Sequence, residues 1–212
     1  MKVLITAGGT REPIDRVRYI SNGSTGATGA ALADELSKRG YNVHLLRGIG
    51  AVLAQSALTG SVFSSAENLE SQLCALLAGG EFDAVIMAAA VADYRPDRVH
   101  AGKLDSGADE LALKLVRVPK ILPRLRGFSP RLLRVIGFKL TAGADNAARQ
   151  TAVTRQFAEG GVDAVVHNDL DEIESAAVHP FRLFHAPGDE PATLSGVPAL
   201  ADALAKYLEA SR

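Results

Sequence analysis

The chain has 212 residues, which is long enough for one domain with a full hydrophobic core, and we expect a single domain over residues 1–212. Its 23 lysines and arginines nearly balance its 24 aspartates and glutamates, which excludes a general binder of nucleic acids or anionic membranes, since such a binder needs a basic excess. The one cysteine, Cys74, excludes an internal disulfide and a cysteine metal cluster. The apolar runs are too short for a signal peptide or a membrane span, which favours a cytoplasmic protein.

Short apolar runs recur along the chain, and each predicts a buried strand. They are Val3–Thr6, Asn42–Leu46, Asp83–Ala88, Leu133–Phe138 and Asp163–His167. Stretches with apolar residues at helical spacing lie between and after them, at 29–40, 69–77, 146–159 and 198–208. This alternation predicts an α/β fold with a doubly wound, mostly parallel, Rossmann-like sheet.

Two segments fit the parallel sheet less well. Residues 103–116 carry alternating leucines at positions 111, 113 and 115, and Phe181–Phe184 is a short apolar run. Both patterns favour strands, and we expect them to form a small antiparallel appendage on the main sheet. Cys74 shares a helical stretch with Leu73 and Leu77, and we expect it to be buried and inert.

The segment after the first strand is the first candidate site, because residues 7–29 are far longer than an ordinary strand-to-helix loop. Its small residues predict free backbone N–H groups at a helix N-terminus, which suit a phosphate. They are Gly8, Ser24, Gly26 and Gly29, and cations are added by Arg11, Arg16 and Arg18. The glycine spacing differs from the dinucleotide fingerprint, and the alternative is a tight helix start with solvated arginines.

Residues 88–96 follow the third predicted strand and form the second candidate site. The alanines at 88–90 leave room for a ligand near the backbone, and Asp93 offers a carboxylate to Mg²⁺ or to a hydroxyl. The alternative is close helix–sheet packing followed by a turn. Lys103 is a third candidate, although a lysine in a glycine-flanked segment is usually only solvated.

Two later strand ends complete the candidates. Phe138 is suited to face a nucleobase that Asn168 hydrogen-bonds, with core packing as the alternative for Phe138. His167 has no visible ligand partner in the sequence, so we predict no metal–histidine site.

Taken together and in this order, the motifs resemble one family, phosphopantothenoylcysteine synthetase (phosphopantothenate–cysteine ligase) of coenzyme A biosynthesis. The resemblance is carried mainly by residues 3–26, which begin Val-Leu-Ile-Thr-Ala-Gly-Gly-Thr-Arg-Glu-Pro, and by residues 88–96, Ala-Ala-Ala-Val-Ala-Asp-Tyr-Arg-Pro. Shorter matches follow at Lys103-Leu-Asp-Ser, Val118-Pro-Lys-Ile-Leu, Ile136-Gly-Phe-Lys-Leu and Asn168-Asp-Leu. We expect the stand-alone form of the synthetase, because no flavin-binding decarboxylase sequence stands before these motifs.

The resemblance implies a ligation in two steps. The carboxylate of 4′-phosphopantothenate attacks the α-phosphorus of CTP or ATP and releases pyrophosphate, and the amine of L-cysteine then attacks the acyl-nucleotide to form the amide. Mg²⁺ is expected on the nucleotide phosphates rather than on side chains. Members of this family are generally dimers, so the resemblance also implies a homodimer.

The roles that the resemblance implies fall on matching positions. Asn22 would bind phosphopantothenate and the acyl-nucleotide, Arg18 would support turnover of that intermediate, and Lys103 would stabilise negative charge while it forms. Further substrate contacts would come from Ala89, Ala90 and Asp93. The nucleotide would contact Gly8, Ser24, Gly26, Gly29, Ala88, Ala89, Asp93, Pro119, Lys120, Ile121, Leu122, Phe138, Arg155 and Asn168.

The chain departs from the family pattern at two places. The lysine-rich motif keeps only its first lysine, Lys103, and the helix that often supplies two lysines to the triphosphate has Arg155 and Glu159. A carboxylate at Glu159 would repel a phosphate if it faced the site. Two other functions remain open: a non-catalytic nucleotide-binding module of the same fold, and an NAD(P)-dependent reductase. The reductase would need a tyrosine–lysine pair that is missing, and an acid where Arg47 stands.

Overall fold

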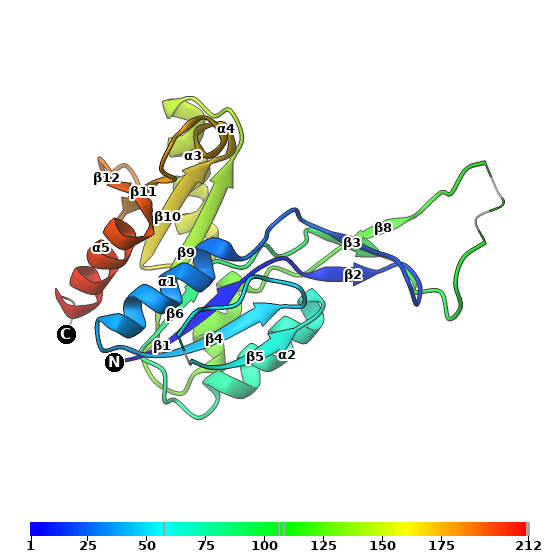
Figure 1. Ribbon diagram of the computed structural model, residues 1–212, viewed down its shortest axis with the longest axis horizontal. Coiled ribbons are helices and arrows are strands. Elements are labelled where there is room, and N and C mark those ends of the chain that lie inside the picture. The colour runs from blue at the N-terminus through cyan, green and yellow to red at the C-terminus, as the bar shows by residue number, and fades with distance from the viewer. Residues whose placement is uncertain (57, 106, 108, 211–212) are drawn as a thin grey trace.

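The computed structural model describes residues 1–56, 58–105, 107 and 109–210, and an eight-stranded sheet forms its centre (Figure 1). In chain order the six parallel strands are β1 (Lys2–Ala7), β4 (Asn42–Gly48), β5 (Thr59–Phe63), β6 (Ala84–Met87), β9 (Arg134–Thr141) and β10 (Ala164–Asp169). Two antiparallel strands, β11 (Pro180–Phe184) and β12 (Ala192–Ser195), extend the sheet beyond β10. The predicted α/β class with a mostly parallel sheet is confirmed.

The order of the parallel strands fixes where a ligand is expected to enter. Across the sheet they run β5-β4-β1-β6-β9-β10, so the chain starts in the middle, moves to one edge and then fills the other side. This is the Rossmann order, and its switch point lies between β1 and β6. The loops that leave the carboxyl ends of β1 and β6 therefore flank the expected ligand crevice.

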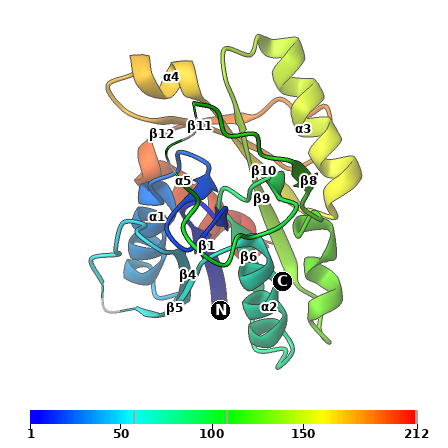
Figure 2. The same cartoon turned by 90° about the vertical axis from the view of Figure 1, so that its right-hand side faces the viewer.

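Helices cover both faces of the sheet (Figure 2). One face carries α1 (Ala27–Lys38) and α5 (Gly196–Ala210), and the other carries α2 (Ala66–Leu77), the 3₁₀ helix η1 (Leu122–Phe128) and α3 (Asn146–Gly160). A short helix, α4 (Leu170–Ser175), follows β10. Both α2 and α3 start at a side-chain cap: Ser65 accepts from the amide of Asn68 at 3.2 Å, and Asp145 accepts from that of Ala148 at 2.8 Å. Among the described residues, no helix is both long and apolar enough to cross a membrane.

Successive side chains of each strand point to opposite faces of the sheet, which produces two hydrophobic cores. Ile5 and Ile86 belong to the core under α1 and α5, whereas Leu4 and Val85 belong to the core under α2 and η1. All four side chains are fully buried. Because helices cover both faces, the central strands are apolar on both sides, which explains why short apolar runs predicted them.

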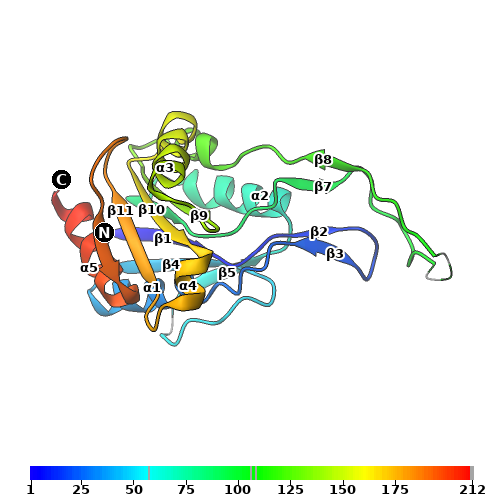
Figure 3. The ribbon, with the colours of Figure 1, turned by 90° about the horizontal axis from the view of Figure 1, so that it is seen from above.

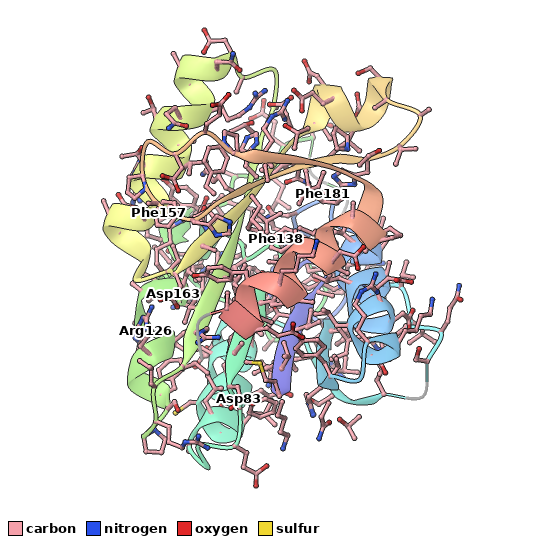
Figure 4. The ribbon with its side chains drawn as sticks, turned by 90° about the vertical axis from the view of Figure 1, so that its left-hand side faces the viewer. Asp83, Arg126, Phe138, Phe157, Asp163 and Phe181 are labelled. Atoms are coloured by element: carbon pink, nitrogen blue, oxygen red, sulfur yellow. The ribbon has the colours of Figure 1, made fainter. Side chains whose placement is uncertain are left out.

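The amino ends of the strands, opposite the expected ligand crevice, are joined by polar contacts (Figure 4). Asp163 lies just before β10 and accepts from Arg126 Nη2 at 2.6 Å and from the amide of Val135 at 2.7 Å. Asp83 lies just before β6 and accepts from the amide of Lys2 at 2.7 Å. These carboxylates hold neighbouring strands and η1 together, so this edge of the sheet is structural.

Two hairpins project from the carboxyl edge of the sheet and run side by side (Figures 1 and 3). In the first, β2 (Arg11–Pro13) pairs antiparallel with β3 (Tyr19–Ser21), and in the second β7 (Tyr94–Pro96) pairs antiparallel with β8 (Leu115–Arg117). The first hairpin follows β1 and the second follows β6, so both are insertions at the switch point. We call the described residues of 11–21 and 94–117 the arm, and the main sheet with its helices the body.

The predicted antiparallel appendage is confirmed for one of its two segments and wrong for the other. Phe181–Phe184 lies in β11, which pairs antiparallel with β10 and extends the main sheet. Of residues 103–116, only Leu115 and Val116 are described in a strand, β8 of the arm. Alternating leucines specify a strand only where one face of that strand packs on a core. Leu111 is instead 52% exposed.

The prediction that Cys74 is buried is also wrong, since this side chain is exposed on α2. The helix buries Leu69, Leu73 and Leu77, which are spaced four residues apart on one stripe. One further residue turns a side chain by about 100° around the helix axis, which carries Cys74 out of the stripe that Leu73 occupies.

Candidate functional site

A cavity of about 480 Å³ lies beyond the carboxyl ends of β6 and β9, within the size range of small-molecule sites. Its walls are the loop after β6, the segment 117–123 and one face of α3. Eight of the predicted nucleotide-binding residues line it: Ala89, Asp93, Pro119, Lys120, Ile121, Leu122, Phe138 and Arg155. The cavity adjoins the switch point on its β6 side, as the strand order leads one to expect.

Positive side chains outnumber negative ones in the cavity. The cations are Arg117, Lys120, Lys139 and Arg155, and the carboxylates are Asp93 and Glu159. Both carboxylates are paired, Asp93 with Lys120, and Glu159 with Arg155 at 2.7 Å. The hydrogen bond that Arg155 donates to Glu159 raises the pKa of the Arg155 guanidinium above its usual range. The remaining positive charge suits an anionic ligand such as a chain of phosphates.

One face of α3 supplies cavity residues that the sequence analysis did not assign. Ala152, Gln156 and Glu159 line the cavity beside Arg155, and these four positions have the i, i+3, i+4, i+7 spacing of a single helical face. Glu159 therefore does face the site. The other unassigned lining residues are Met87, Val91, Ala92, Tyr94, Arg117, Pro123, Lys139 and Gly160. The helical spacing around Arg155 is the sequence signal that could have identified these residues of α3.

Phe138 contributes to the cavity from β9, but its ring also packs against the core under α1 and α5. Strand alternation places Phe138 on the same face as Ile136, which belongs to that core. The carbonyl of Phe138 accepts a hydrogen bond from Gln156 Nε2 of α3 at 3.2 Å. Core packing, the alternative considered for this residue, therefore applies to its ring, and Phe138 also belongs to the cavity lining.

Hydrogen bonds join the two loops at the switch point. The amide of Ala90 donates to the carbonyl of Gly8 at 2.9 Å, and the amide of Thr10 donates to the carbonyl of Ala90 at 3.2 Å. The hydroxyl of Thr6 accepts from the amide of Ala89 at 3.1 Å. Small side chains allow this approach of two backbones, so the centre of the crevice is filled by protein and the cavity opens beside it.

Asn22 lies outside the cavity lining but contacts the loop after β6 that lines it. It comes directly after β3, is exposed, and donates from Nδ2 to the carbonyl of Val91 at 3.3 Å. Val91 lines the cavity, and Ala88 and Ala90 lie half-buried in the same loop. We call this loop after β6, which contains the alanines at 88–90, the alanine loop. The structure thus brings Asn22 together with the alanine loop, although 65 or more residues separate them in sequence.

The glycines after β1 have a packing explanation. Gly8 and Gly26 have φ values of +85° and +77°, and a Cβ on them would come within 2.7 and 2.9 Å of the Cβ of Ala51. A Cβ on Gly29 would come within 2.6 Å of the Cβ of Ala7 on β1. The start of α1 is therefore pressed against the end of β1, with Ser24 exposed just before it. A phosphate-binding role for these residues stays a prediction.

Asn168 lies outside the cavity lining, and its Nδ2 is 3.0 Å from Nε2 of His179. Its neighbour Asp169 accepts from the hydroxyl of Thr141 at 2.6 Å and from two backbone amides of the turn between β9 and α3 at 3.0 Å. The hydroxyl of Thr141 contributes most to holding the pKa of Asp169 well below its usual range. This motif therefore fixes the turn that carries α3 toward the cavity.

His167 lies inside the fold, where it contacts other protein groups. It is fully buried, and its Nε2 lies 2.8 Å from the hydroxyl of Thr141. Burial, and then the charges of Arg149 and Arg182, lower the pKa of His167 to about 4. The part of the chain that the structure describes contains no group of three or more His, Cys, Asp or Glu side chains arranged to hold a metal ion.

Arg18 and Lys103 lie on the arm, outside the cavity lining. Arg18 donates to the carbonyl of Leu104, which is the neighbour of Lys103, and Arg18 Nε lies 3.4 Å from Asp15 Oδ2. The two residues to which the resemblance gives catalytic roles on the arm are thus in adjoining segments. Ser106, the last residue of the Lys-Leu-Asp-Ser motif, lies outside the described residues.

Comparisons with known proteins agree with this geometry. Residues 1–188 match the family described as DNA/pantothenate metabolism flavoprotein C-terminal domain. The coenzyme A biosynthesis bifunctional protein CoaBC of Thermococcus kodakarensis is 36% identical over 172 residues, covering 80% of this chain and 41% of that protein. The CoaBC protein of Mycolicibacterium smegmatis is 34% identical over 223 residues, covering 99% of this chain and 53% of that protein. The chain spans about half the length of these curated relatives.

A solved structure shows the same architecture. The DNA/pantothenate metabolism flavoprotein from Streptococcus pneumoniae superimposes with a TM-score of 0.88 at 25% identity, over 100% of both chains. The strand order, the cavity at the carboxyl ends of the strands, the sequence matches and this likeness all lead to one conclusion: the chain belongs to the DNA/pantothenate metabolism flavoprotein C-terminal domain family.

Proposed function

We propose that this chain is a phosphopantothenate–cysteine ligase, which joins 4′-phosphopantothenate to L-cysteine through an acyl-nucleotide formed from CTP or ATP. The observation that carries the proposal is the positively charged cavity beyond β6 and β9, lined by the alanine loop to which Asn22 donates a hydrogen bond. Family membership and the similarity to CoaBC proteins support a place in coenzyme A biosynthesis. Because those relatives are bifunctional and about twice as long, assigning the ligation to this chain is part of the proposal.

In the first step, a carboxylate oxygen of phosphopantothenate forms a bond to the α-phosphorus of the nucleotide. The bond from that phosphorus to the bridging oxygen of the β-phosphate breaks, and pyrophosphate leaves with the electron pair. Lys120, Lys139 and Arg155 line the cavity in which this negative charge develops, and fixed cations stabilise such charge strongly where water is excluded. Lys103, carried by the arm, would add its charge when the arm covers the cavity.

In the second step, the amine of cysteine forms a bond to the acyl carbon. The bond from that carbon to the phosphate oxygen breaks, the nucleoside monophosphate leaves, and the new amide nitrogen loses a proton. The acyl-nucleotide must be kept from water until the amine arrives. Asn22 is exposed beside the alanine loop, where its amide can hydrogen-bond the intermediate, and the arm is the segment suited to cover it.

The cavity has an apolar part and a charged part, which suit the two ends of a nucleotide. Pro119, Ile121 and Leu122 offer apolar surface to the base, and the cations face the phosphates. Mg²⁺ would be bound by the phosphates, since both cavity carboxylates are already paired with cations. When bound there, it would neutralise phosphate charge and polarise the α-phosphoryl group.

A homodimer formed through the arm is a second part of the proposal. Large apolar side chains are exposed along the arm: Val17, Tyr19, Tyr94, Val99, Leu111 and Leu115. A gathering of exposed apolar side chains of this kind marks an interaction surface, and a second copy of the chain would cover it. Sedimentation of the wild type should give a dimer, and Val17→Asp should shift it toward the monomer. A monomeric wild type would contradict the homodimer.

The decisive experiment is pyrophosphate release from purified protein with Mg²⁺, 4′-phosphopantothenate and either CTP or ATP, with and without L-cysteine. Release that requires phosphopantothenate, with amide product only when cysteine is added, is the expected result and shows which nucleotide is used. Nucleotide binding without any pyrophosphate release, from folded protein, would favour the non-catalytic module and overturn the ligase proposal.

A further inference from the structure

The turn of the first hairpin contains a buried carboxylate that the reaction steps do not use. Asp15 lies between β2 and β3, and its side chain has no exposed surface, while Val17, two residues away, is 63% exposed. Aspartate in a surface turn ordinarily faces water, and its burial requires hydrogen-bond partners.

Each oxygen of Asp15 has its own partners. Oδ1 accepts from the amides of Val17 and Arg18, both at 2.7 Å, and so closes the hairpin turn. Oδ2 accepts from the amide of Leu104, on the second hairpin, at 3.0 Å. Since Arg18 also donates to the carbonyl of Leu104, both backbone groups of that residue are bound to the first hairpin. The amide of Leu104 is the largest of the contacts that lower the pKa of Asp15 to about 2.

These bonds hold a segment that has little other regular structure. Strand β7 ends at Pro96 and β8 begins at Leu115, and the described residues between them belong to no strand or helix. A second tie comes from the amide of His100, which donates to the carbonyl of Ile14 at 2.9 Å. Open space surrounds Gly102, where an added Cβ would meet nothing within 4 Å. Lys103 is thus located by the ties at His100 and Leu104, on either side of it.

We propose that Asp15 is a positioning residue for Lys103. It fixes the backbone of Leu104 and thereby the place from which the lysine ammonium group reaches the reacting phosphates. The inference rests on the proposed ligase function, in which Lys103 stabilises the charge of acyl-nucleotide formation. Asp15 itself would touch no substrate and would act on Lys103 through the backbone of Leu104, while its other contacts, with the turn amides and Arg18, lie within the first hairpin.

Asp15→Asn separates the two tasks of the carboxylate. Asparagine keeps one oxygen for the turn amides but turns an NH₂ group toward the amide of Leu104, which ends that tie together with the ion pair between Oδ2 and Arg18 Nε. We expect kcat for pyrophosphate release to fall about tenfold, because a misplaced charge loses transition-state stabilisation, while KM for the nucleotide stays within about twofold. The matched control is Asp97→Asn, the same chemical change elsewhere on the arm, and it should leave both parameters unchanged.

A double-mutant cycle with Lys103→Ala distinguishes positioning from general weakening of the arm. If Asp15 acts through Lys103, Asp15→Asn should cause less than about a twofold further loss of kcat in the Lys103→Ala background. Losses that multiply, as expected of independent sites, would overturn the proposal. If Asp15→Asn fails to fold, as seen by circular dichroism, Leu104→Pro removes the same hydrogen bond from the other side and enters the cycle in its place.

Limited digestion with trypsin tests the tie without relying on activity. Cleavage after Arg98 and Lys103, followed by mass spectrometry, should be several-fold faster in Asp15→Asn than in Asp97→Asn. If the wild type has no ligase activity and cleavage still accelerates, the proposed function fails and the tie between Asp15 and the Lys103 segment stands. Unchanged cleavage in Asp15→Asn would overturn the tie and with it the positioning role.

Discussion

Different interactions stabilise the body and the arm. In the body, strands of four to eight residues lie between two layers of helices, and side chains such as Ile5 and Val85 are fully buried. In the arm, each strand has three residues, and its segments are joined by individual polar contacts such as the one from Leu104 to Asp15. Burial is distributed over many residues, whereas the contacts of the arm depend on a few atoms. We therefore expect substitutions in the body mainly to lower the stability of the fold, and substitutions in the arm mainly to lower the proposed activity.

The largest expected effect tests the chemistry of the arm. Under the proposed mechanism, Lys103→Ala should lower kcat for pyrophosphate release by about a hundredfold or more, because it would remove a charge that stabilises the transition state. Its thermal unfolding should match that of the wild type, since Lys103 is exposed. Lys114→Ala is the matched control, an exposed lysine on the same arm whose Nζ lies 3.9 Å from Asp97. An equal loss of kcat in both variants would contradict a specific role for Lys103.

The next effect tests the packing of the body. Gly29→Val should lower the free energy of unfolding by about 1–3 kcal/mol, because its Cβ would come within 2.6 Å of Ala7. For a chain of this length, such a change corresponds to roughly 2–12 °C in Tm. Gly102→Val on the arm meets open space and should change Tm by no more than about 2 °C. Calorimetry that finds equal shifts would contradict the proposed contrast between body and arm.

A smaller effect concerns the charge of the cavity. Glu159→Gln should lower KM for the nucleotide by roughly two- to fivefold, because it frees Arg155 to meet a phosphate, although solvent screening limits the gain at this exposed pair. Glu174→Gln, an exposed glutamate on α4, serves as control and should leave KM unchanged. If Glu159→Gln raises KM instead, Glu159 positions Arg155 rather than opposing the phosphates.

The smallest effect is a dependence on pH that belongs to the arm. The pKa of Asp15 is about 2 in the folded protein, below the usual value of about 3.9 for an unfolded chain, so its contribution is fully present above pH 4 and is lost as the pH falls through 2. The Tm difference between wild type and Asp15→Asn should therefore be constant from pH 7 to 5 and shrink below pH 4. A difference that stays constant down to pH 2.5 would show that the charge of Asp15 does not matter.

The same contrast explains what the sequence could predict. Five of the six parallel strands and the major helices followed from apolar periodicity, because residues such as Leu4 and Leu73 are buried for the reason that their pattern suggests. The sixth, the edge strand β5, was not predicted, since only Phe63 of its residues is buried. Cavity residues next to strand ends, such as Asp93 and Lys120, followed from motifs. The arm did not follow, because pairing of three-residue strands leaves no periodic signal, and the buried role of Asp15 depends on a residue 89 positions away. Phe138 shows a further limit, since a motif locates a residue without saying whether its ring or its backbone faces the ligand.

The single thiol gives a practical way to observe the arm. Cys74 is the only cysteine of the chain and is exposed on α2, whose buried stripe is anchored in the body by Leu69 and Leu73. A fluorescent dye attached there marks a fixed point without disturbing a buried contact. With Leu111→Cys as a second attachment point on the exposed arm, energy transfer between two dyes would report whether the distance from arm to body changes when nucleotide and phosphopantothenate are added.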